Sequence, residues 1–489
     1  MIGDDGRDAE RTEGDGPKGM PTRPPAPLPG DILERLREVV GSRYFKVRTF
    51  ETLAYSTDAN QAFRGLPQAV VVPGTAGETR EVVRILAESR IPFVARGSGT
   101  GLSGGAVPVH GGVVVDLARL GHTLDGKPED RLARVGAGVT NLRLSEWGAG
   151  HGLFFAPDPS SQVVCSVGGN VAENSGGSHC LKYGVTLNHV LGLDVVLPTG
   201  EAMRLGGEAV DWPGYDLAGL FVGSEGTLGV ATEAIVSFTR RPRAVRTVLA
   251  LFGSEADPSE TVAEVMASGI VPAAMEMMDR LAMDGVERGP HRVGYPDRVQ
   301  AVLLLEVDGL EESVEDDAAA IRAICERHHV LDAVTARSED ERRLWWQNRK
   351  TAFGAMGNLA PNYYVQDGVI PRTRLPDVLP RVRRTAAEAG LRVANVFHAG
   401  DGNLHPLLLF DAKRPGETKR ALEAGSEILR LCVELGGSIT GEHGVGIEKR
   451  EEMALMYTPE ELRLMDEVRR VFDPFGLANP GKVLPPSLL

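Results

Sequence analysis

Two short segments near the carboxyl end of the chain concentrate side chains that can bind a metal ion. Residues 396–407 read VFHAGDGNLHPL, and residues 440–450 read TGEHGVGIEKR. In a hairpin turned by Ala-Gly-Asp-Gly-Asn, His398 ends one strand and His405 begins the next. Cross-strand neighbours lie about 5 Å apart, so both imidazoles can reach one ion. Glu442 adds a carboxylate. Two nitrogens and one carboxylate oxygen suit Zn²⁺ or Mn²⁺ and leave a coordination position open for a substrate.

The histidine pair alone is weak evidence, because a His–x6–His spacing is typical of ordinary surface histidines. The neighbouring Glu442 and His443 lie in a glycine-flanked loop, and their addition favours a metal site. Asp401 and Asn403 are first of all turn residues, and a role around the ligands is secondary. The same ligands with a bound water would suit a metal hydrolase, so the pattern by itself leaves the reaction open.

A glycine-rich segment in the first half of the chain predicts close contact between backbone and a phosphorylated ligand. Residues 96–105 read RGSGTGLSGG, and residues 99–104 match the GxGxxG dinucleotide fingerprint. That motif binds pyrophosphate at the start of a helix, but here the following AVPVHGG leads to a strand. We therefore exclude a Rossmann fold and expect backbone N–H groups, with Ser98, Thr100 and Ser103, to wrap a diphosphate as a nest.

Two further segments share this composition. They are residues 157–177, PDPSSQVVCSVGGNVAENSGG, and residues 223–230, GSEGTLGV. The chain contains 59 glycines among 489 residues, which is more than average usage. Three such loops at strand ends suit an extended cofactor better than a single phosphate.

Length and composition limit the class of protein. A chain of 489 residues with 42% hydrophobic residues is expected to form two or three globular domains. The net charge of −14 argues against a nucleic-acid partner, and no apolar run reaches membrane-spanning length. Residues 1–30 are acidic and then rich in Gly and Pro, which predicts a disordered leader rather than a secretory signal. The four scattered cysteines favour free thiols in a reducing cytoplasm.

Hydrophobic periodicity predicts two β-α-β units in the first half and an α+β domain in the second. A capping box formed by Thr75 and Glu78 starts the first crossover helix. After residue 243 the spacing suits an antiparallel sheet with helices on one face, and from about residue 421 the chain is mostly helical. The other expected helices are 31–41, 141–150 with Thr140 as cap, 257–268, 311–328 and 377–389. The expected strands are 69–73, 92–95, 112–117, 132–135, 191–197 paired with 201–205, 245–252, 300–307, and 392–398 paired with 404–410.

Six motifs occur in an order that resembles a known family. RGSGTGLSGGAVP, SVGGNVAENSGG, GSEGTLGV, HAGDGNLHP, GEHGVG and NPGK follow one another in the FAD-linked D-2-hydroxy-acid dehydrogenases, which belong to the vanillyl-alcohol-oxidase-type flavoprotein superfamily. The likeness covers residues 45–485 and is strongest to the glycolate oxidase FAD subunit and D-lactate dehydrogenase types. It implies an α+β protein with a two-part, PCMH-type FAD-binding domain, a ferredoxin-like α+β cap domain and C-terminal helices. The implied bounds are a leader at 1–30, the FAD-binding domain at 31–243, the cap at 244–430 and a C-terminal segment at 431–489 that packs on the FAD domain.

The resemblance also implies which residues contact FAD. We expect the cofactor to be non-covalent, because the histidine nearest to the diphosphate loop, His110, lies outside its glycine core. His179 is a less favoured tether, and Cys180 is expected to pack. The implied contacts are Arg96, Gly97, Ser98, Gly99, Thr100, Gly101, Leu102, Ser103, Gly104 and Gly105 at the diphosphate, Pro157, Ser161, Gly168, Gly169, Asn170 and Asn174 along the ribityl chain and ring, Glu225, Gly229 and Val230 at the nucleotide, and Asn479 near the ring.

Oxidation of a 2-hydroxy acid requires the loss of the hydroxyl proton and the transfer of a hydride from Cα to flavin N5. The resemblance implies His398, His405 and Glu442 as metal ligands, and a metal there would stabilise the alkoxide. His443 is expected to accept the proton. Arg349, in LWWQNRKTAF, matches the arginine that binds the substrate carboxylate in this family.

Competing interpretations of this segment are a surface arginine, with Lys350 as the exposed partner, and a pair of core tryptophans at 345 and 346. Two apolar positions narrow the substrate further. Relatives that act on 2-hydroxyglutarate carry a lysine where this chain has Val365 and an asparagine where it has Leu407. Apolar side chains cannot pair a second carboxylate, so glycolate or D-lactate is favoured.

The expected function is oxidation of a small D-2-hydroxy monocarboxylate to the 2-oxo acid, with electrons passed to an acceptor other than oxygen. The alternatives are a D-2-hydroxyglutarate dehydrogenase, a metal hydrolase without flavin, and a flavin-binding subunit that is inactive without partners. Expected partners are Fe–S and second flavoprotein subunits or a quinone-linked acceptor, since the cysteine spacing does not suit a cluster of its own. The expected location is the cytoplasm, with membrane contact through partners.

Overall fold

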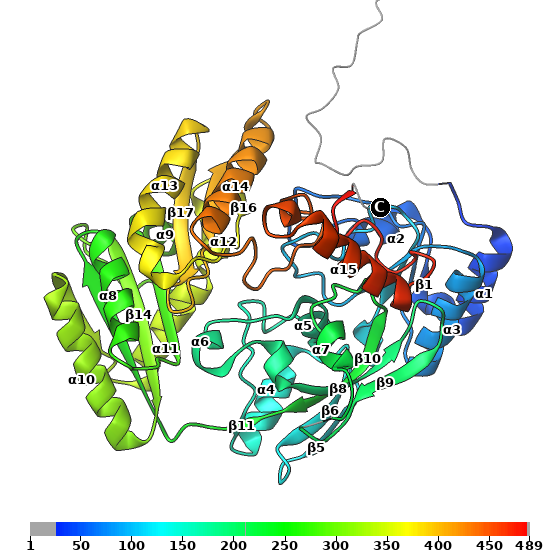
Figure 1. The fold of residues 1–489 in the computed structure, drawn as a ribbon, viewed down its shortest axis with the longest axis horizontal. Coiled ribbons are helices and arrows are strands. Elements are labelled where there is room, and N and C mark those ends of the chain that lie inside the picture. Colours follow the sequence, from blue (N-terminus) through cyan, green and yellow to red (C-terminus); the bar gives the residue numbers. More distant parts are fainter. Residues whose placement is uncertain (1–25, 211, 487–489) are drawn as a thin grey trace, which may run out of the picture.

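The computed structural model describes residues 26–210 and 212–486, and within them no helix is long and apolar enough to cross a membrane. Figure 1 shows two lobes, one built mainly from the first half of the chain and one built from the green to orange segments. Residues 1–25 of the predicted leader lie outside the described residues. Leu28, in its last part, is buried in a core of the first lobe.

The first lobe contains a small sheet in the order β1-β2-β4-β3, in which β2, β4 and β3 run parallel. The crossover helix α3 begins as predicted, because the Thr75 side chain accepts a hydrogen bond from the Glu78 N–H at 3.0 Å. Glu78 in turn accepts from the Gly74 N–H at 2.7 Å, one residue before the predicted partner. Buried side chains of α1 and α3 pack on this sheet. The bounds are α1 Gly30–Val40, β1 Phe45–Lys46, α2 Thr49–Thr52, β2 Ala69–Val71, α3 Ala76–Glu88, β3 Phe93–Arg96 and β4 Val113–Asp116.

A second, antiparallel sheet completes this lobe in the order β5-β6-β10-β8-β9. The predicted hairpin is confirmed, because β8 pairs antiparallel with β9. The predicted helix α4 is also confirmed, with the Thr140 side chain accepting from the Arg143 N–H at 3.3 Å. The bounds are β5 Leu124–Lys127, β6 Leu132–Gly136, α4 Asn141–Gly150, β7 Leu153–Phe154, α5 Val167–Glu173, α6 Cys180–Tyr183, β8 Val190–Val196, β9 Ala202–Gly206, α7 Leu217–Phe221, β10 Val230–Ser237 and β11 Thr239–Arg240.

Two of the three glycine-rich segments, residues 97–105 and 223–230, contain no helix, and the segment between them contains one. Residues 97–112, between β3 and β4, contain turns and bends but no helix, which confirms the argument against a Rossmann fold. By contrast, the second segment contains α5, which the sequence did not predict. Ser166 caps it by accepting from the Gly169 N–H at 3.2 Å, and the low helix propensity of two glycines is offset by burial of Val167 and Val171.

The second lobe is a seven-stranded sheet in the order β15-β12-β14-β13-β17-β18-β16. The predicted pairing of β17 with β18 is confirmed. The bounds are β12 Ala244–Phe252, α8 Ala256–Ala267, β13 Ala274–Asp279, α9 Arg280–Val286, β14 Ala301–Gly309, α10 Glu311–Arg327, β15 Val330–Thr335, α11 Glu339–Lys350, α12 Ala352–Ala355, β16 Asn362–Val365, α13 Leu375–Glu388, β17 Arg392–His398, β18 Pro406–Phe410 and α14 Glu417–Glu434.

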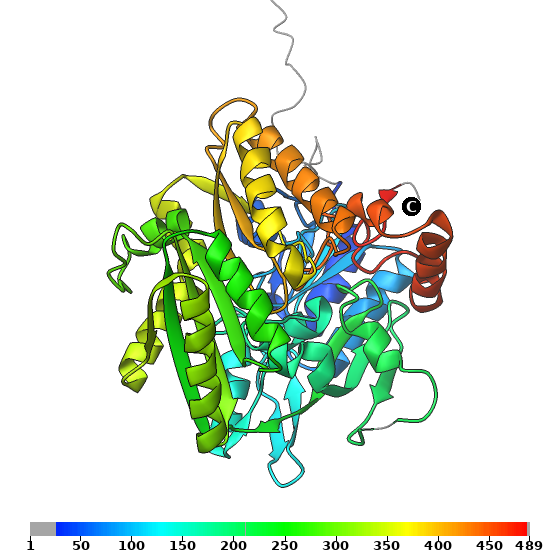
Figure 2. The same ribbon diagram turned by 60° about the vertical axis from the view of Figure 1, so that its left-hand side comes forward.

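Helices cover both faces of this sheet, so the expectation of helices on one face was wrong. Figure 2 shows the layer formed by α8, α10, α13 and α14. The opposite face packs against α9, α11 and α12. The physical reason lies in the strands, because β14 is apolar at every position from Ala301 to Leu305. Leu303 and Leu305 enter one core, whereas Val302 and Leu304 enter the other.

The end of the chain returns to the first lobe (Figure 1). Helix α15, Pro459–Phe472, contributes Phe472 to the core of the five-stranded sheet. Ala478 then bridges to Phe93 on β3, and the Asn479 N–H donates to the Phe93 carbonyl at 2.8 Å. These contacts bring the NPGK segment beside the edge of the parallel sheet.

Candidate active site

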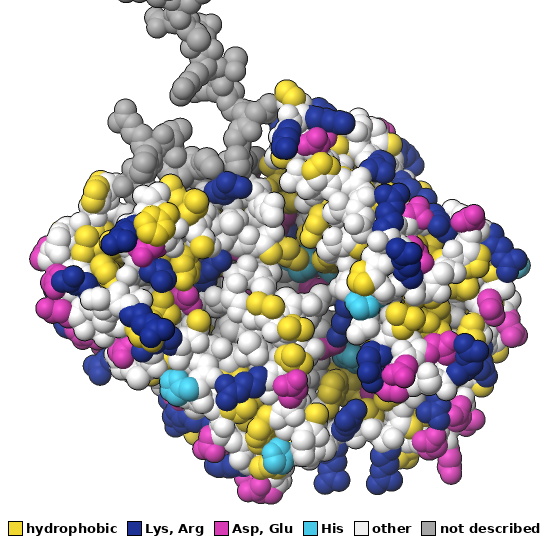
Figure 3. All heavy atoms as spheres, turned by 180° about the vertical axis from the view of Figure 1, so that it is seen from behind, with side chains coloured by type: hydrophobic (Ala, Val, Ile, Leu, Met, Phe, Trp, Pro, Cys, Tyr) yellow, Lys and Arg dark blue, Asp and Glu magenta, His cyan; other side chains and the backbone are white. Residues whose placement is uncertain are grey.

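A cavity of about 350 Å³ lies where the two lobes meet. All three glycine-rich segments contribute to its lining, and the second lobe adds Lys350, Phe353, Glu442 and His443. Figure 3 shows the face opposite to that of Figure 1, with histidine and acidic side chains visible in the crevice between the lobes. Residues more than 300 positions apart in sequence therefore face one space.

One side of this cavity, which we call the glycine wall, consists of Gly97, Gly99, Gly101, Gly105, Gly168, Gly169, Gly226 and Gly229. Within the part of the chain that the structure describes, no group accepts a hydrogen bond from the backbone N–H of residues 98–105. A run of donors without protein partners beside a cavity suits an acceptor-rich ligand. A diphosphate supplies such acceptors, so the donor set of this wall fits the predicted cofactor.

The space in front of the wall depends on missing side chains. A Cβ added to Gly169 would meet only the Ser166 Oγ, at 3.3 Å, and one added to Gly226 would meet nothing closer than 3.9 Å. Both positions therefore open toward the cavity. Gly99 also needs its backbone conformation, with φ +69°, and a Cβ there would collide with the Arg96 guanidinium at 2.1 Å.

Most residues expected to contact FAD line this cavity, and the rest lie behind its wall. Asn479 does not line it, but its Nδ2 donates to the carbonyls of Gly105 at 2.8 Å and Glu225 at 2.7 Å. It thereby ties the first glycine segment to the third. Arg96 lines the cavity and donates to the Thr57 carbonyl at 2.9 Å. The lining residues are Arg96, Gly97, Ser98, Gly99, Thr100, Gly101, Leu102, Gly105, Ser161, Gly168, Gly169, Asn170, Glu225 and Gly229, and those outside the lining are Ser103, Gly104, Pro157, Asn174, Val230 and Asn479.

Glu225 has a second task that its sequence context did not reveal. Its buried carboxylate accepts from the N–H groups of Val445 and Gly446, each at 2.7 Å. The third glycine segment is thus joined directly to the loop that carries Glu442 and His443. The histidines considered as covalent tethers, His110 and His179, are both outside the cavity lining.

The facing side of the cavity carries a group that we call the imidazole cluster, made of His398, His405, Glu442 and His443. The Glu442 Oε1 lies 3.2 Å from the His398 Nε2 and 3.4 Å from the His405 Nε2. One ligand atom each from His398, His405 and Glu442 lies within 4.8 Å of the others. The three predicted ligands therefore converge on one point, as a metal site requires.

Buried charges brace this cluster. The His398 Nδ1 lies 2.7 Å from the Glu276 Oε1, on the central strand β13, and the Glu276 Oε2 lies 2.6 Å from the Arg349 Nη2. Burial would lower the pKa of His398, but the carboxylates of Glu276 and Glu442 raise it well above its ordinary value. The carboxylates of Glu276 and Glu442 on either side of the His398 ring make this a position that favours a cation. A carboxylate behind a ligating histidine is the usual way to orient such a ring.

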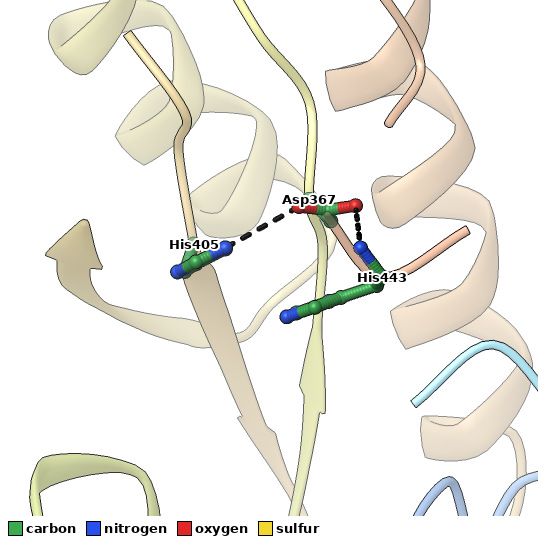
Figure 4. A group of neighbouring side chains, drawn as sticks. All are labelled: Asp367, His405 and His443. Carbon is green, nitrogen blue, oxygen red and sulfur yellow. Dashed lines mark hydrogen bonds and ion pairs between the residues drawn. The ribbon is translucent and has the colours of Figure 1, made fainter. Parts of the chain in front are cut away.

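Asp367, which the sequence did not single out, organises the loop behind the cluster. Its buried carboxylate lies 3.3 Å from the His405 Nε2 and accepts from the His443 N–H at 2.8 Å, as Figure 4 shows. It also binds the Thr440 hydroxyl and the Lys449 ammonium. Asp367, His405 and His443 form a second group with metal-binding spacing. Asp367 belongs to YYVQDGVIP, where a lone aspartate before glycine looks like a turn residue.

The His443 ring faces the cavity and stacks on the His405 ring, with centroids 4.8 Å apart. Its Nδ1 is buried, and no described residue makes a hydrogen bond with it. Burial lowers the pKa of His443 to about 4. The imidazole is therefore neutral near pH 7 and can accept a proton.

The two basic residues at the end of α11 point to different places. Arg349 is 3% exposed and does not line the cavity, because its guanidinium pairs with Glu276. Lys350 does line the cavity, and its Nζ lies 3.0 Å from the Asp158 Oδ2. In this structure Lys350 is thus the nearer cation for an anionic ligand, and Arg349 acts on His398 through Glu276.

A second set of buried charges joins the lobes beside Lys350. The His179 Nδ1 lies 3.0 Å from the Asp158 Oδ2 in the first lobe, and its Nε2 lies 3.5 Å from the Glu306 Oε1 in the second. Burial would lower the pKa of His179, but these carboxylates raise it to about 10. Lys350 pairs with Asp158, and Arg342 pairs with both Glu306 and Glu339. With His179 protonated, the three positive charges of the set are balanced by three carboxylates.

The two apolar positions that narrowed the substrate are neighbours. Val365 on β16 pairs with Leu407 on β18, and both are buried in the core against α11 and α12. Neither residue lines the cavity, so their effect on the choice of substrate stays a prediction.

Comparisons with known proteins agree with both halves of the cavity. Residues 67–206 match the family described as FAD binding domain, and residues 241–483 match the family described as FAD linked oxidases, C-terminal domain. The glycolate oxidase subunit GlcD of Escherichia coli (strain K12) is 46% identical over 454 residues, covering 93% of this chain and 91% of that protein. GlcD of Bacillus subtilis (strain 168) is 38% identical over 93% of this chain and 96% of that protein. D-lactate dehydrogenase of Archaeoglobus fulgidus is 35% identical over 85% and 91%.

Solved structures extend the likeness to the fold. p-Cresol methylhydroxylase with substrate bound superposes with a TM-score of 0.79 at 19% identity, over 94% of this chain and 98% of that one. 4-Ethylphenol oxidase from Gulosibacter chungangensis superposes with a TM-score of 0.79 at 20% identity, over 96% and 100%.

Proposed function

This chain belongs to the family of FAD-linked oxidases and is an FAD-dependent hydroxy-acid dehydrogenase, and we propose that its substrate is a small D-2-hydroxy monocarboxylate, glycolate or D-lactate. The expected α+β architecture with a PCMH-type FAD-binding domain is confirmed. The observation that carries the substrate proposal is the single cavity that joins the glycine wall to the imidazole cluster.

The glycine wall is proposed to hold FAD without a covalent bond. Its backbone donors suit the diphosphate, and neither His110 nor His179 lines the cavity. Bound FAD would supply the hydride acceptor for the oxidation. The protein's own contribution at this wall is to bind and to exclude side chains from the space that the cofactor needs.

His398, His405 and Glu442 are proposed to hold a divalent metal ion, Zn²⁺ or Mn²⁺. The charges support a cation, because the carboxylates of Glu442, Glu276 and Asp367 surround the two imidazoles. A bound metal would supply positive charge beside the substrate hydroxyl. Glu276 and Asp367 orient the ligating rings and the Glu442 loop.

His443 is proposed as the base that accepts the hydroxyl proton. Its neutral ring lines the cavity beside Glu442, so the acceptor nitrogen is available without prior deprotonation. The sequence resemblance assigns the substrate carboxylate to Arg349, and that assignment stays a prediction. In the described conformation Lys350 offers a cation at the cavity surface, where it could pair with the substrate carboxylate.

A monocarboxylate is favoured over a dicarboxylate because the Val365–Leu407 pair offers no partner for a distal carboxylate, and an unpaired buried charge is costly. The electrons are proposed to leave for an acceptor other than oxygen, in partner subunits or a quinone-linked carrier. The GlcD relatives are named as subunits, which supports partners, and the free cysteines suit the cytoplasm as location.

The decisive experiment mixes the purified, FAD-loaded protein anaerobically with glycolate, D-lactate, L-lactate or D-2-hydroxyglutarate and follows bleaching of the flavin absorbance. Fast bleaching by glycolate or D-lactate is expected, with slow or no bleaching by the other two. Bleaching only by D-2-hydroxyglutarate would replace the substrate, and a colourless protein that hydrolyses esters or amides would favour the metal hydrolase.

A further inference from the structure

A second cavity, of about 280 Å³, lies at the seam between the lobes. The first lobe contributes the loop at residues 59–64 and Leu102 of the diphosphate segment. The second lobe contributes β16, the end of β18 and the first turns of α14. Of the residues that line it, only Leu102 and Val365 were given a role above.

The two cavities share Leu102, which lines both of them. This shared point is held firmly. The Asn60 Nδ2 donates to the Leu102 carbonyl at 2.8 Å, and the Ala59 N–H donates to the Gly101 carbonyl at 3.1 Å. The loop that forms one side of the second cavity is therefore bonded to the segment that lines the cofactor cavity.

The lining of the second cavity has a distinct chemistry. It contains the aromatic rings of Tyr363, Tyr364 and Phe410, and Leu422 and Val365 add aliphatic surface. Its side-chain donors are Arg64, the amides of Gln61 and Asn362, and the hydroxyls of Tyr363, Tyr364 and Thr418, whereas the Asn60 amide already donates to the Leu102 carbonyl. None of the described residues that line it is acidic, although the chain as a whole carries a net charge of −14.

These features select the class of ligand. The absence of carboxylates from the lining disfavours a metal ion or an organic cation. A small hydroxy acid does not need three aromatic rings, and the first cavity already offers it a cation and a base. A planar ring with carbonyl oxygens uses both parts of the lining, because the aromatic side chains contact its faces and the amides and Arg64 donate to its oxygens. The volume suits a single substituted ring in a pocket at a domain interface.

We propose that the second cavity binds the electron acceptor, a quinone with a single substituted ring, which is reduced across Leu102. The proposal rests on the function proposed above. The hydroxy acid loses a hydride from Cα and a proton from its hydroxyl, which together are two electrons and two protons. The quinone gains two electrons and two protons and leaves as the hydroquinone, so FAD returns to its oxidised form and the overall exchange balances.

Ala59→Trp tests this assignment, because Ala59 is exposed and lines the second cavity but not the first. Ala54→Trp is the matched control, since Ala54 is equally exposed a few residues earlier and lines neither cavity. The probe is 2,3-dimethoxy-5-methyl-1,4-benzoquinone. Its binding to the oxidised, FAD-loaded protein is measured by calorimetry without any hydroxy acid, and the rate of flavin reoxidation is measured separately by stopped flow.

We expect Ala59→Trp to raise both the Kd for the quinone and its KM in reoxidation at least tenfold, with Ala54→Trp within twofold of wild type. Arg64→Gln, at the exposed rim, should raise the Kd several-fold through the loss of one donor. Equal quinone binding by Ala59→Trp and wild type would overturn the proposal, as would competition between quinone and glycolate or D-lactate for one site. The proposal would also be overturned if the quinone did not bind and only a partner protein reoxidised the flavin. Failure of the proposed function would give a different result from failure of this proposal. Hydroxy acids would then not bleach the flavin, but quinone binding, which is measured without them, would be unaffected.

Discussion

The glycine wall and the imidazole cluster face the same cavity but are built on opposite principles. The wall binds through its backbone, because residues without side chains expose their N–H donors. A single Cβ at Gly169 or Gly226 would enter the cavity. The cluster acts through side chains, and buried carboxylates hold two of its rings, Glu276 that of His398 and Asp367 that of His405. Backbone N–H groups do not change their protonation state near pH 7, whereas the chemistry of an imidazole depends on its protonation state. Substitutions should therefore separate cofactor binding from turnover.

His443→Ala is the change expected to have the largest effect. Loss of the base should slow anaerobic flavin reduction by glycolate or D-lactate about 100- to 10,000-fold. FAD content should stay at the wild-type level, because the glycine wall is untouched. Stopped-flow absorbance gives the rate, and the visible spectrum of the purified protein gives the FAD content. An unchanged reduction rate would remove His443 from the role of base.

Removal of a metal ion should have the next largest effect and should again spare FAD. Extended dialysis against a chelator is expected to slow flavin reduction about 100-fold, since a metal ion stabilises developing charge by several kcal/mol. Addition of Zn²⁺ or Mn²⁺ should restore the rate, and elemental analysis before and after dialysis identifies the ion. If a metal-free protein reduces its flavin at the original rate, the three ligands have another purpose.

Gly169→Leu should produce the opposite pattern, with weak FAD binding in a folded protein. The Cβ of the new side chain would meet only the Ser166 Oγ, at 3.3 Å, and the leucine should weaken FAD binding about 10- to 100-fold by occupying the space in front of the wall. Gly77→Leu is the control, because Gly77 lies in the first turn of α3, is exposed and does not line the cavity. FAD affinity is measured by fluorescence titration of the apoprotein, and circular dichroism checks folding. Equal FAD affinity of the two variants would contradict the role of the wall.

The smallest expected effect concerns the buried charges around His179, which join the two lobes. His179 has a pKa raised from 6.5 to about 10, so its pairing stabilises the folded protein fully below about pH 6.5 and is lost as pH rises toward 10. Over that window the free energy of unfolding should fall by about 1.4 kcal/mol per pH unit from this group alone. His179→Gln should flatten this slope, whereas His122→Gln, at an exposed position, should not. Melting temperatures at pH 7 and pH 9 compare the three proteins, and parallel slopes would argue against the buried pair.

Elements with local signals were predictable from the sequence. The cap at Thr75, the cap at Thr140 and the hairpin of β17 and β18 each depend on residues only a few positions apart. The missing helix after residues 97–105 was predictable for the same reason. Helix α5 was missed because burial overrides its glycines, and β13 was missed because AMEMMD becomes a strand only between β14 and β17.

The residues of the candidate site also divide into those with a local sequence signal and those without one. The three predicted metal ligands converge, because a hairpin turn brings His398 near His405 and a glycine-flanked loop carries Glu442 to them. Glu276 and Asp367 could not be found, since each lies far in sequence from the ring it holds. The same is true of the choice between Arg349 and Lys350. Their adjacent positions on a helix look alike in sequence, but β13 supplies Glu276 to one and the first lobe supplies Asp158 to the other.

The sequence by itself determined the ingredients of this protein, namely three glycine segments that predict a backbone-bound cofactor and three ligands for a cation. Backbone freedom and side-chain donors are properties of residue types, and short-range turns carry them into place. Only the tertiary structure decided that both groups line one cavity, that buried carboxylates hold the rings, and that a second cavity meets the first at Leu102. These outcomes depend on the packing of two lobes, and packing energy is set by pairs of surfaces that are distant in sequence.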